Sequence, residues 1–182
     1  MNAAHEQIMI QKCRNGEAAA FGPLIKNYRR QLYSYLLRLS GNREDAEDLF
    51  QETLIKTWKG MKRYSDQQKF SSWLFTIAHN TAMDKLRKRN KENMITEIEP
   101  DELHHTNDPH KELIWKEVGE KIKKAVEQLS FKQKTVFLLR ANGEMSFKEI
   151  SQATNEPLNT VLSHMHYSIK KIKSFLGNEN EQ

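Results

Sequence analysis

The pattern of apolar and polar residues predicts helices along most of this chain, most clearly between Asn42 and Arg87. Placed about 100° apart per residue, as in an α-helix, the apolar side chains of 42–61 gather on one side. These are Ala46, Leu49, Phe50, Thr53, Leu54 and Met61. The opposite side carries Asp48, Glu52, Ile55 and Lys59. An apolar residue ringed by charge is typical of a helix face that anchors a partner, although scattered exposed isoleucines are also common.

The segment 69–89 predicts a second helix with two different sides. Its inward side holds Phe70, Leu74, Ile77, Ala78 and Thr81, widened by Phe75, Ala82 and Leu86. The other side carries Trp73, Thr76, Asn80, Met83 and Arg87, and leads into a basic cluster of Lys85, Arg87, Lys88, Arg89 and Lys91. An aromatic ring, an amide and a cation along one groove suit unstacked bases, because the ring stacks, the amide reads an edge and the cation meets phosphate. The basic loop 62–69 adds Tyr64.

The remaining segments predict further helices and no strands. Upstream we expect helices over 5–15 and 18–40, ending at Gly16 and Gly41, which completes a bundle of about four helices. Downstream we expect helices over 113–129 and 130–141, then a short helix opened by the capping box 146–149, and a turn at Asn155. The last helix is expected to hold Leu158, Val161, Met165, Ile169, Ile172 and Leu176 inward.

Two helices joined by a short turn, the second long and polar outside, form a helix-turn-helix. The outer side of the last helix carries Asn159, Thr160, Ser163, His164, Tyr167, Lys170 and Lys171. We expect its N-terminal residues to meet base edges in a major groove and its lysines to meet phosphates.

The residues DAEDLFQETLIKTWK followed by FSSWLFTIAHNTAMDKLRK closely resemble the core-binding and promoter-melting helices of bacterial sigma-70 family sigma factors. The best match is the small two-domain, extracytoplasmic-function (ECF) type, and the helix-turn-helix is a second match to the same family. The resemblance implies an all-α fold in four parts. These are a region 2-like helical bundle over 1–91, an acidic linker over 92–112, a region 4-like helix-turn-helix bundle over 113–177 and a tail over 178–182.

The same resemblance implies an alternative sigma factor that binds core RNA polymerase at its clamp and flap, recognises the −10 and −35 promoter elements and melts DNA. The clamp contacts would be Asp48, Gln51, Glu52, Ile55 and Lys59. The −10 contacts would be Arg63, Tyr64, Phe70, Trp73, Thr76, Asn80, Met83, Arg87 and Lys88. The −35 contacts would be the seven outer residues of the last helix. An anti-sigma factor is a further expected partner, and the linker would thread the polymerase, where its acids mimic nucleic acid; a solvated tether is the alternative.

This chain departs from the family in its last helix. Basic residues are usual where Leu162, His164 and Tyr167 stand, and glycine is usual at Asn155 and Asn159. Fewer cations at the groove imply weaker direct duplex binding or an unusual upstream element.

The composition of the chain indicates how charge is distributed and in which cellular compartment we expect the protein. The chain has 182 residues, a hydrophobic content of 37% and a net charge of +5, which suits two small helical domains and favours a polyanionic partner. Ten cations face only Asp66 and Asp84 over 53–91, whereas seven acids face Lys111 over 92–112. The single Cys13 excludes an internal disulfide and is expected to be a small core residue. We see no signal peptide or membrane-spanning run, so we expect a cytoplasmic protein.

Catalytic and metal-binding patterns are missing from the sequence. His104, His105 and His110 cluster, as do His164 and His166, but neither set has carboxylate or cysteine partners at zinc-site spacing. No phosphate-binding loop or nucleophile elbow is visible, so we expect no metal, cofactor, small-molecule substrate or enzymatic activity. Two alternatives remain open, namely a helix-turn-helix regulator with a sensing bundle and a sigma-like adaptor or decoy. A metal-dependent hydrolase comes last.

Overall fold

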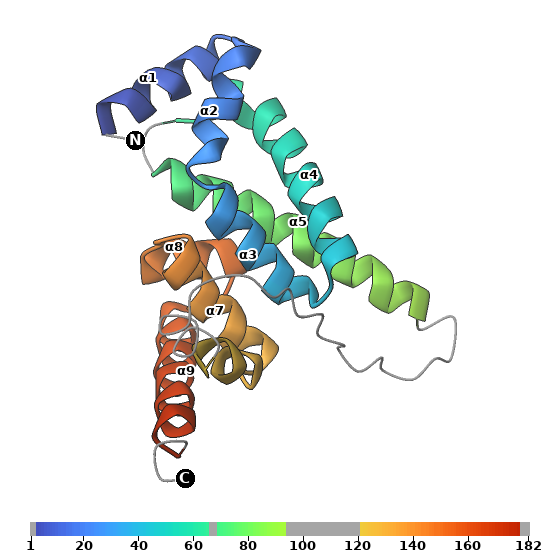
Figure 1. Ribbon diagram of the computed structural model, residues 1–182, viewed down its shortest axis with the longest axis vertical. Helices are drawn as coiled ribbons and strands as arrows, with labels where there is room; N and C mark the ends of the chain where they lie inside the picture. The colour runs from blue at the N-terminus through green and yellow to red at the C-terminus, as the bar shows by residue number, and fades with distance from the viewer. Residues whose placement is uncertain (1–2, 66–68, 94–120, 179–182) are drawn as a thin grey trace. The chain divides into compact units, whose positions relative to one another are not determined.

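The computed structural model describes residues 3–65, 69–93 and 121–178, which form helices joined by short turns (Figure 1). No strand occurs in those ranges, and the predicted all-α class is confirmed. The predicted linker beyond residue 93 and the first part of the 113–129 helix lie outside the described residues, and 121–127 is helical. The elements are α1 (Ala3–Arg14), η1 (Ala18–Ala20), α2 (Phe21–Lys26), α3 (Arg29–Ser40), α4 (Arg43–Gly60), η2 (Met61–Arg63), α5 (Phe70–Asn93), α7 (Phe131–Asn142), α8 (Phe147–Thr154) and α9 (Leu158–Asn178).

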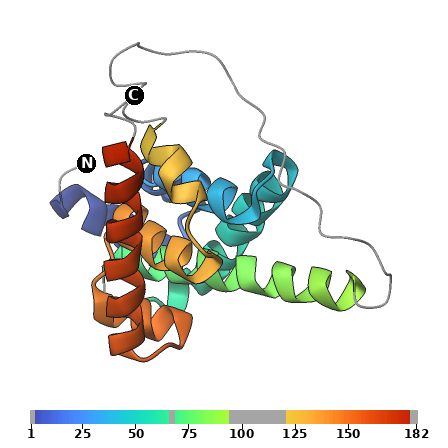
Figure 2. The ribbon, with the colours of Figure 1, turned by 90° about the horizontal axis from the view of Figure 1, so that it is seen from below.

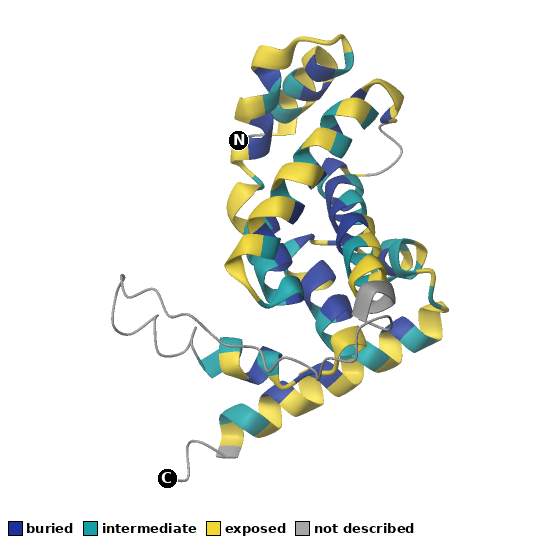
Figure 3. Ribbon diagram, turned by 90° about the vertical axis from the view of Figure 1, so that its right-hand side faces the viewer, coloured by how far each residue is buried: buried dark blue, intermediate teal, exposed yellow. Residues whose placement is uncertain are grey.

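The chain forms two compact units, the first containing α1 to α5 and the second α7 to α9. In the first unit α3, α4 and α5 pack on one another, and α1 packs on α2 and η2. Buried residues lie on the sides of α3, α4 and α5 that face the interior (Figure 3). The C-terminal end of α5 extends past the other helices of this unit (Figure 2). The largest buried side chains of this core are Leu24, Leu32, Tyr35, Leu36, Met61, Leu74 and Phe75.

The α4–α5 pair has clear start and stop signals. Gly41 ends α3 in the left-handed conformation, with a φ of 80° that glycine adopts without steric cost. Asn42 then caps α4, because its side-chain oxygen accepts a hydrogen bond of 2.8 Å from the Asp45 N–H. Both predicted helices are present, and α5 continues a few residues beyond the predicted end at Arg89.

The single helix predicted over 18–40 is wrong. The structure divides it into η1, α2 and α3, with a break at Asn27 and Tyr28. The side-chain amide of Asn27 lies within 3.4 Å of the Leu24 carbonyl, where it competes with the backbone for helix hydrogen bonds. The apolar pattern runs across the break because α2 and α3 both bury their apolar residues, so periodicity alone did not show it.

The second unit begins its helices as the sequence predicts. Ser130 and Gln133 exchange backbone and side-chain hydrogen bonds at the start of α7. At α8 the Ser146 hydroxyl accepts from the Glu149 N–H at 3.3 Å, and the Glu149 carboxylate accepts from the Ser146 N–H at 2.7 Å. Asn155 ends α8 with a φ of 54°, a left-handed conformation that asparagine tolerates. The predicted capping box and turn are confirmed.

The predicted inward side of α9 is partly wrong. Leu158 and Ile169 are exposed, whereas the fully buried positions are Val161 and Ser168, with Ile172 also buried. These three positions define a narrow buried stripe, and at about 100° per residue Leu158 and Ile169 fall beside it rather than on it. The Ser168 hydroxyl donates to the carbonyls of His164 and Gln133, so a buried polar residue joins α9 to α7.

Removing the α8 cap should weaken the second unit measurably. We expect Ser146→Ala to lower its free energy of unfolding by about 1 kcal/mol, because the Glu149 N–H loses its hydroxyl acceptor. Ser174→Ala, at an exposed position of α9, is the matched control and should change it by less than about 0.5 kcal/mol. Urea unfolding followed by circular dichroism measures both. Equal midpoints for the two variants would show that the cap is dispensable.

Candidate functional sites

The outer side of α4 presents the five residues predicted to bind polymerase, and we call them the α4 stripe. All five are exposed, and they are Asp48, Gln51, Glu52, Ile55 and Lys59. Ile55 is 54% exposed although Ala46, Leu49, Thr53 and Thr57 on the other side are buried. The predicted exposure of Ile55 is therefore confirmed. An aliphatic side chain among charges on a rigid helix offers a partner an apolar anchor with a polar rim.

An ion-pair network joins the first turns of α4 to the second half of α5. Lys85 Nζ lies 2.6 Å from Asp45 Oδ1 and 3.3 Å from Asp48 Oδ2, and Arg89 Nη1 lies 3.7 Å from Asp45 Oδ2. Burial pushes the pKa of Asp45 up, but hydrogen bonds from Lys85 and Asn42 outweigh it and lower the pKa overall. For Lys85, burial lowers the pKa, but the hydrogen bonds to Asp45 and Asp48 outweigh this effect and raise the pKa overall.

This network changes the interpretation of the basic cluster. The sequence groups Lys85 and Arg89 with the cations available to DNA, but both lie against Asp45. Lys88 stays exposed, and Arg87 is exposed beside Asp84, its neighbour within the same helix. The pairing joins residues about forty positions apart, and helical periodicity carries no signal for it.

The outward side of α5 carries the predicted promoter-melting residues in one row. Asn80 and Arg87 are exposed, and Trp73, Thr76 and Met83 are half-buried. Arg63 in η2 is exposed as well. The arrangement places a ring, an amide and a cation along one helix face, as predicted, and their contacts with DNA remain a prediction.

Tyr64 and Phe70 occupy a different place from the one predicted. Their side chains are only 4% and 3% exposed, so they have no free ring face for a base. Tyr64 packs against Trp73 with ring centroids 4.9 Å apart, and Phe70 packs against both rings at 5.7 and 5.8 Å. Packed together, the three rings bury more apolar surface than they would in a solvent-exposed loop, and this burial favours the packed arrangement. Their role is to support Trp73.

Trp73 also lies against Gly60, the last residue of α4. A methyl group added at Gly60 would lie 3.0 Å from Cζ2 of the indole. The indole therefore sits directly on the backbone of α4, in one fixed position, with part of the ring accessible. No local pattern of residues predicts this contact.

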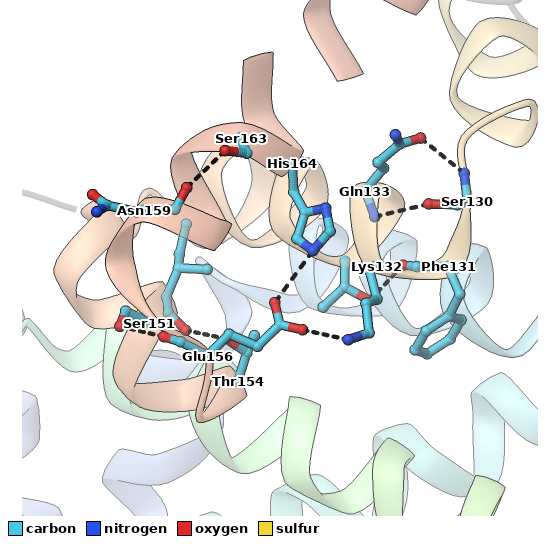
Figure 4. A network of polar contacts seen from close by, with 12 residues as sticks. Ser130, Phe131, Lys132, Gln133, Ser151, Thr154, Glu156, Asn159, Ser163 and His164 are labelled. Atoms are coloured by element: carbon cyan, nitrogen blue, oxygen red, sulfur yellow. Dashed lines mark hydrogen bonds and ion pairs between the residues drawn. The ribbon is translucent and has the colours of Figure 1, made fainter. Parts of the chain in front are cut away.

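In the second unit, α9 presents the predicted duplex-binding residues unevenly. Asn159, Ser163, Tyr167 and Lys170 are exposed, and Thr160 is half-buried. The Ser163 hydroxyl donates to the Asn159 carbonyl at 2.9 Å, which leaves the Asn159 side-chain amide pointing outward (Figure 4).

Two of the predicted residues make polar contacts within the unit. The His164 ring faces Glu156, with Nε2 3.6 Å from Oε2, and Lys132 holds the other carboxylate oxygen at 2.8 Å (Figure 4). Lys171 donates to the Gln128 carbonyl. His164 therefore helps to fix the turn before α9, and Lys171 helps to fasten α9 to the preceding helices.

The described residues show neither a metal site nor a membrane span. Within 3–65, 69–93 and 121–178 no three histidine, cysteine, aspartate or glutamate side chains come together to hold an ion. His104, His105 and His110 lie outside the described residues. Each helix in the same ranges is too short or too polar to serve as a bilayer-spanning segment. Cys13 is buried in the first unit, as predicted, and burial raises the pKa of its thiol.

Comparison with known families matches both units. The Sigma-70 region 2 family matches residues 24–92, and the Sigma-70, region 4 family matches residues 119–172, so the matches cover well over half of the chain. The chain belongs to the sigma-70 family of RNA polymerase sigma factors. Within that family it is a promoter-recognition factor of the extracytoplasmic-function type.

Named relatives support that placement. ECF RNA polymerase sigma factor SigW of Bacillus subtilis (strain 168) is 27% identical over 170 residues, covering 86% of this chain and 89% of SigW. RNA polymerase sigma factor YlaC of the same strain is 26% identical over 162 residues, covering 87% of this chain and 93% of YlaC.

Solved structures show the same fold. The sigma factor RpoE, crystallised with the anti-sigma factor NepR from Bartonella quintana, has a TM-score of 0.71 and 22% identity over 86% of this chain and 96% of RpoE. CnrH in complex with the cytosolic domain of CnrY has a TM-score of 0.65 and 18% identity, covering 96% of this chain and 98% of CnrH.

The Asp45 network predicts a specific acid response. Because the folded unit lowers the pKa of Asp45, its carboxylate stabilises the fold above its unfolded pKa of about 3.9, and this stabilisation is lost as the pH falls through the lower folded value. Asp45→Asn removes the titration. We expect its free energy of unfolding to fall less than that of the wild type between about pH 6 and pH 2.5.

Glu44→Gln, at an exposed position in the same turn, is the control and should keep the wild-type slope. Urea unfolding at stepped pH measures all three proteins. A wild-type slope in Asp45→Asn would show that the network does not contribute to acid stability.

Proposed function

We propose that the α4 stripe is the surface by which this sigma factor binds the clamp of core RNA polymerase. The observation that carries this proposal is the exposure of Ile55 between Glu52 and Lys59 on a helix whose opposite side is fully packed. A buried isoleucine contact would supply the hydrophobic anchor, and Asp48 and Glu52 would meet cations of the clamp. Bond formation in RNA then belongs to the polymerase, and this chain supplies recognition.

We further propose that the outward side of α5 holds the separated non-template strand of the −10 element. Trp73 offers a ring on which a base can stack, worth about 1–3 kcal/mol per base. Asn80 can read a base edge, Met83 adds apolar contact, and Arg87 meets phosphate. Thr76, Arg63 and Lys88 border this row, and Tyr64 and Phe70 hold Trp73 in place.

The second unit would bind the −35 element as duplex through α9. Asn159, Thr160 and Ser163 lie near its start, where a helix-turn-helix meets base edges, and Tyr167 and Lys170 follow near the middle of the helix. Its apolar rim would also meet the polymerase flap. The complexes of RpoE with NepR and of CnrH with CnrY support an anti-sigma factor as a regulator of this chain too.

Disrupting the α4 stripe should abolish polymerase binding without unfolding the protein. We expect the double variant Ile55→Asp and Glu52→Lys to fail to co-purify with core polymerase. The first change removes the apolar anchor, and the second reverses the sign of a charge beside it. Ile8→Asp is the matched control, since Ile8 is an equally exposed isoleucine on α1. It should bind normally. Circular dichroism checks the fold of each variant, and retained binding by the double variant would refute the clamp assignment.

Changes on α5 should separate melting from polymerase binding. We expect Trp73→Ala or Asn80→Ala to reduce open complexes about 10-fold or more, from the loss of one stacked or hydrogen-bonded base, at unchanged polymerase affinity. Permanganate footprinting of the −10 region and polymerase pull-down measure the two steps. Asn15→Ala, at an exposed asparagine after α1, should leave both unchanged. Equal losses in both assays would contradict the melting role.

A further inference from the structure

The first three turns of α9 and the turn before them contain no permanent cation. No lysine or arginine occurs between Lys148 and Lys170, whereas Lys170, Lys171 and Lys173 follow within one turn. In place of cations, the start of α9 exposes aliphatic surface. Leu162 is 41% exposed, and Leu158 beside it is exposed too. A helix that met DNA only through phosphate contacts would carry the opposite composition.

Leu162 lies among the polar groups of the outer side. It follows Asn159 by three residues and precedes His166 by four, so all three are neighbours on the helix surface. The Asn159 amide makes no hydrogen bond within the described residues, and Figure 4 shows it directed away from α7. An unbonded amide and an exposed leucine therefore lie next to each other in the first two turns of the helix.

Major-groove chemistry gives this pair a specific complement. The only apolar group on a base edge in that groove is the C5-methyl of thymine, and an asparagine amide pairs in bidentate fashion with adenine. Resting on the duplex binding proposed above, we infer that α9 reads A·T base pairs, with Leu162 in contact with a thymine methyl group and Asn159 paired with an adenine. Lys170 and Lys173 meet the phosphates that hold the helix in the groove.

This inference explains the lack of cations. The specificity comes from shape and methyl contact, and few phosphates are neutralised near the bases, so the salt dependence of upstream binding is shallow. A protein-docking surface is the competing account of the same aliphatic residues. It makes no distinction between thymine and uracil, which differ only by the C5-methyl.

The test uses the holoenzyme, that is the full chain bound to core polymerase. Duplexes selected by it from a pool randomised upstream of a fixed −10 element give the preferred sequence, which should contain A·T pairs. Each thymine is then replaced by deoxyuridine. We expect one position to lose about fourfold in affinity, the value of one buried methyl group. Leu162→Ala should bind the thymine and uracil duplexes equally.

Ile169→Ala is the matched control, because Ile169 is equally exposed on the same flank of α9, two turns further on. It should keep the wild-type preference for thymine. The inference would be overturned if replacing thymine by deoxyuridine did not lower the affinity of the wild type. It would also be overturned if the replacement lowered the affinity of Leu162→Ala by the same factor. If the proposed duplex binding itself is wrong, the outcome is different. The selection would then give no preferred upstream sequence, and Lys170→Ala would not change the affinity for DNA.

Discussion

The packing of α4 against α3 and α5 is the interaction on which the first unit depends. The inner side of α4 is built from Ala46, Leu49, Thr53 and Thr57, mostly small residues that allow the neighbouring helices to approach closely (Figure 3). The Thr57 hydroxyl is satisfied by the Thr53 carbonyl at 2.7 Å, so it is buried without an unmet hydrogen bond. Because this one contact fixes the rotation of α4, it also fixes Ile55 on the outside. The α5 helix packs on the same surface, so its outward row is set by the same contact.

The aromatic cluster next to this packing gives Trp73 a fixed position. Tyr64 and Phe70 are buried against it, and the Gly60 backbone lies against the Cζ2 edge of the indole. A ring that is already immobile loses little conformational entropy when a base stacks on it, so more of the stacking energy is available to hold the strand open. The buried aromatics thus contribute to the proposed melting indirectly.

The sequence was sufficient where one local pattern decides the structure. The α4–α5 pair, the exposure of Ile55 and the Ser146–Glu149 capping box all follow from periodicity or short-range hydrogen bonding. Long-range contacts were not accessible in this way. The break at Asn27 interrupts no apolar pattern, and Tyr64 is buried from a segment between helices, where helical periodicity does not apply. The pairing of Lys85 with Asp45 joins residues that are distant in sequence. Ile169 is exposed because the apolar residues of α9 span a wider arc than the stripe that is buried, so they do not determine which side of the helix faces the core.

The paired and missing cations have a common consequence for the proposed function. On α5, Lys85 and Arg89 are paired with Asp45 and Asp48, and the start of α9 has no lysine or arginine. Phosphate contacts supply most sequence-independent affinity for DNA, so each unit by itself should bind DNA weakly. Two weak sites in one chain become effective when binding at one raises the local concentration of the other. A polymerase that holds both units beside the promoter would provide that condition, which makes DNA recognition depend on the holoenzyme.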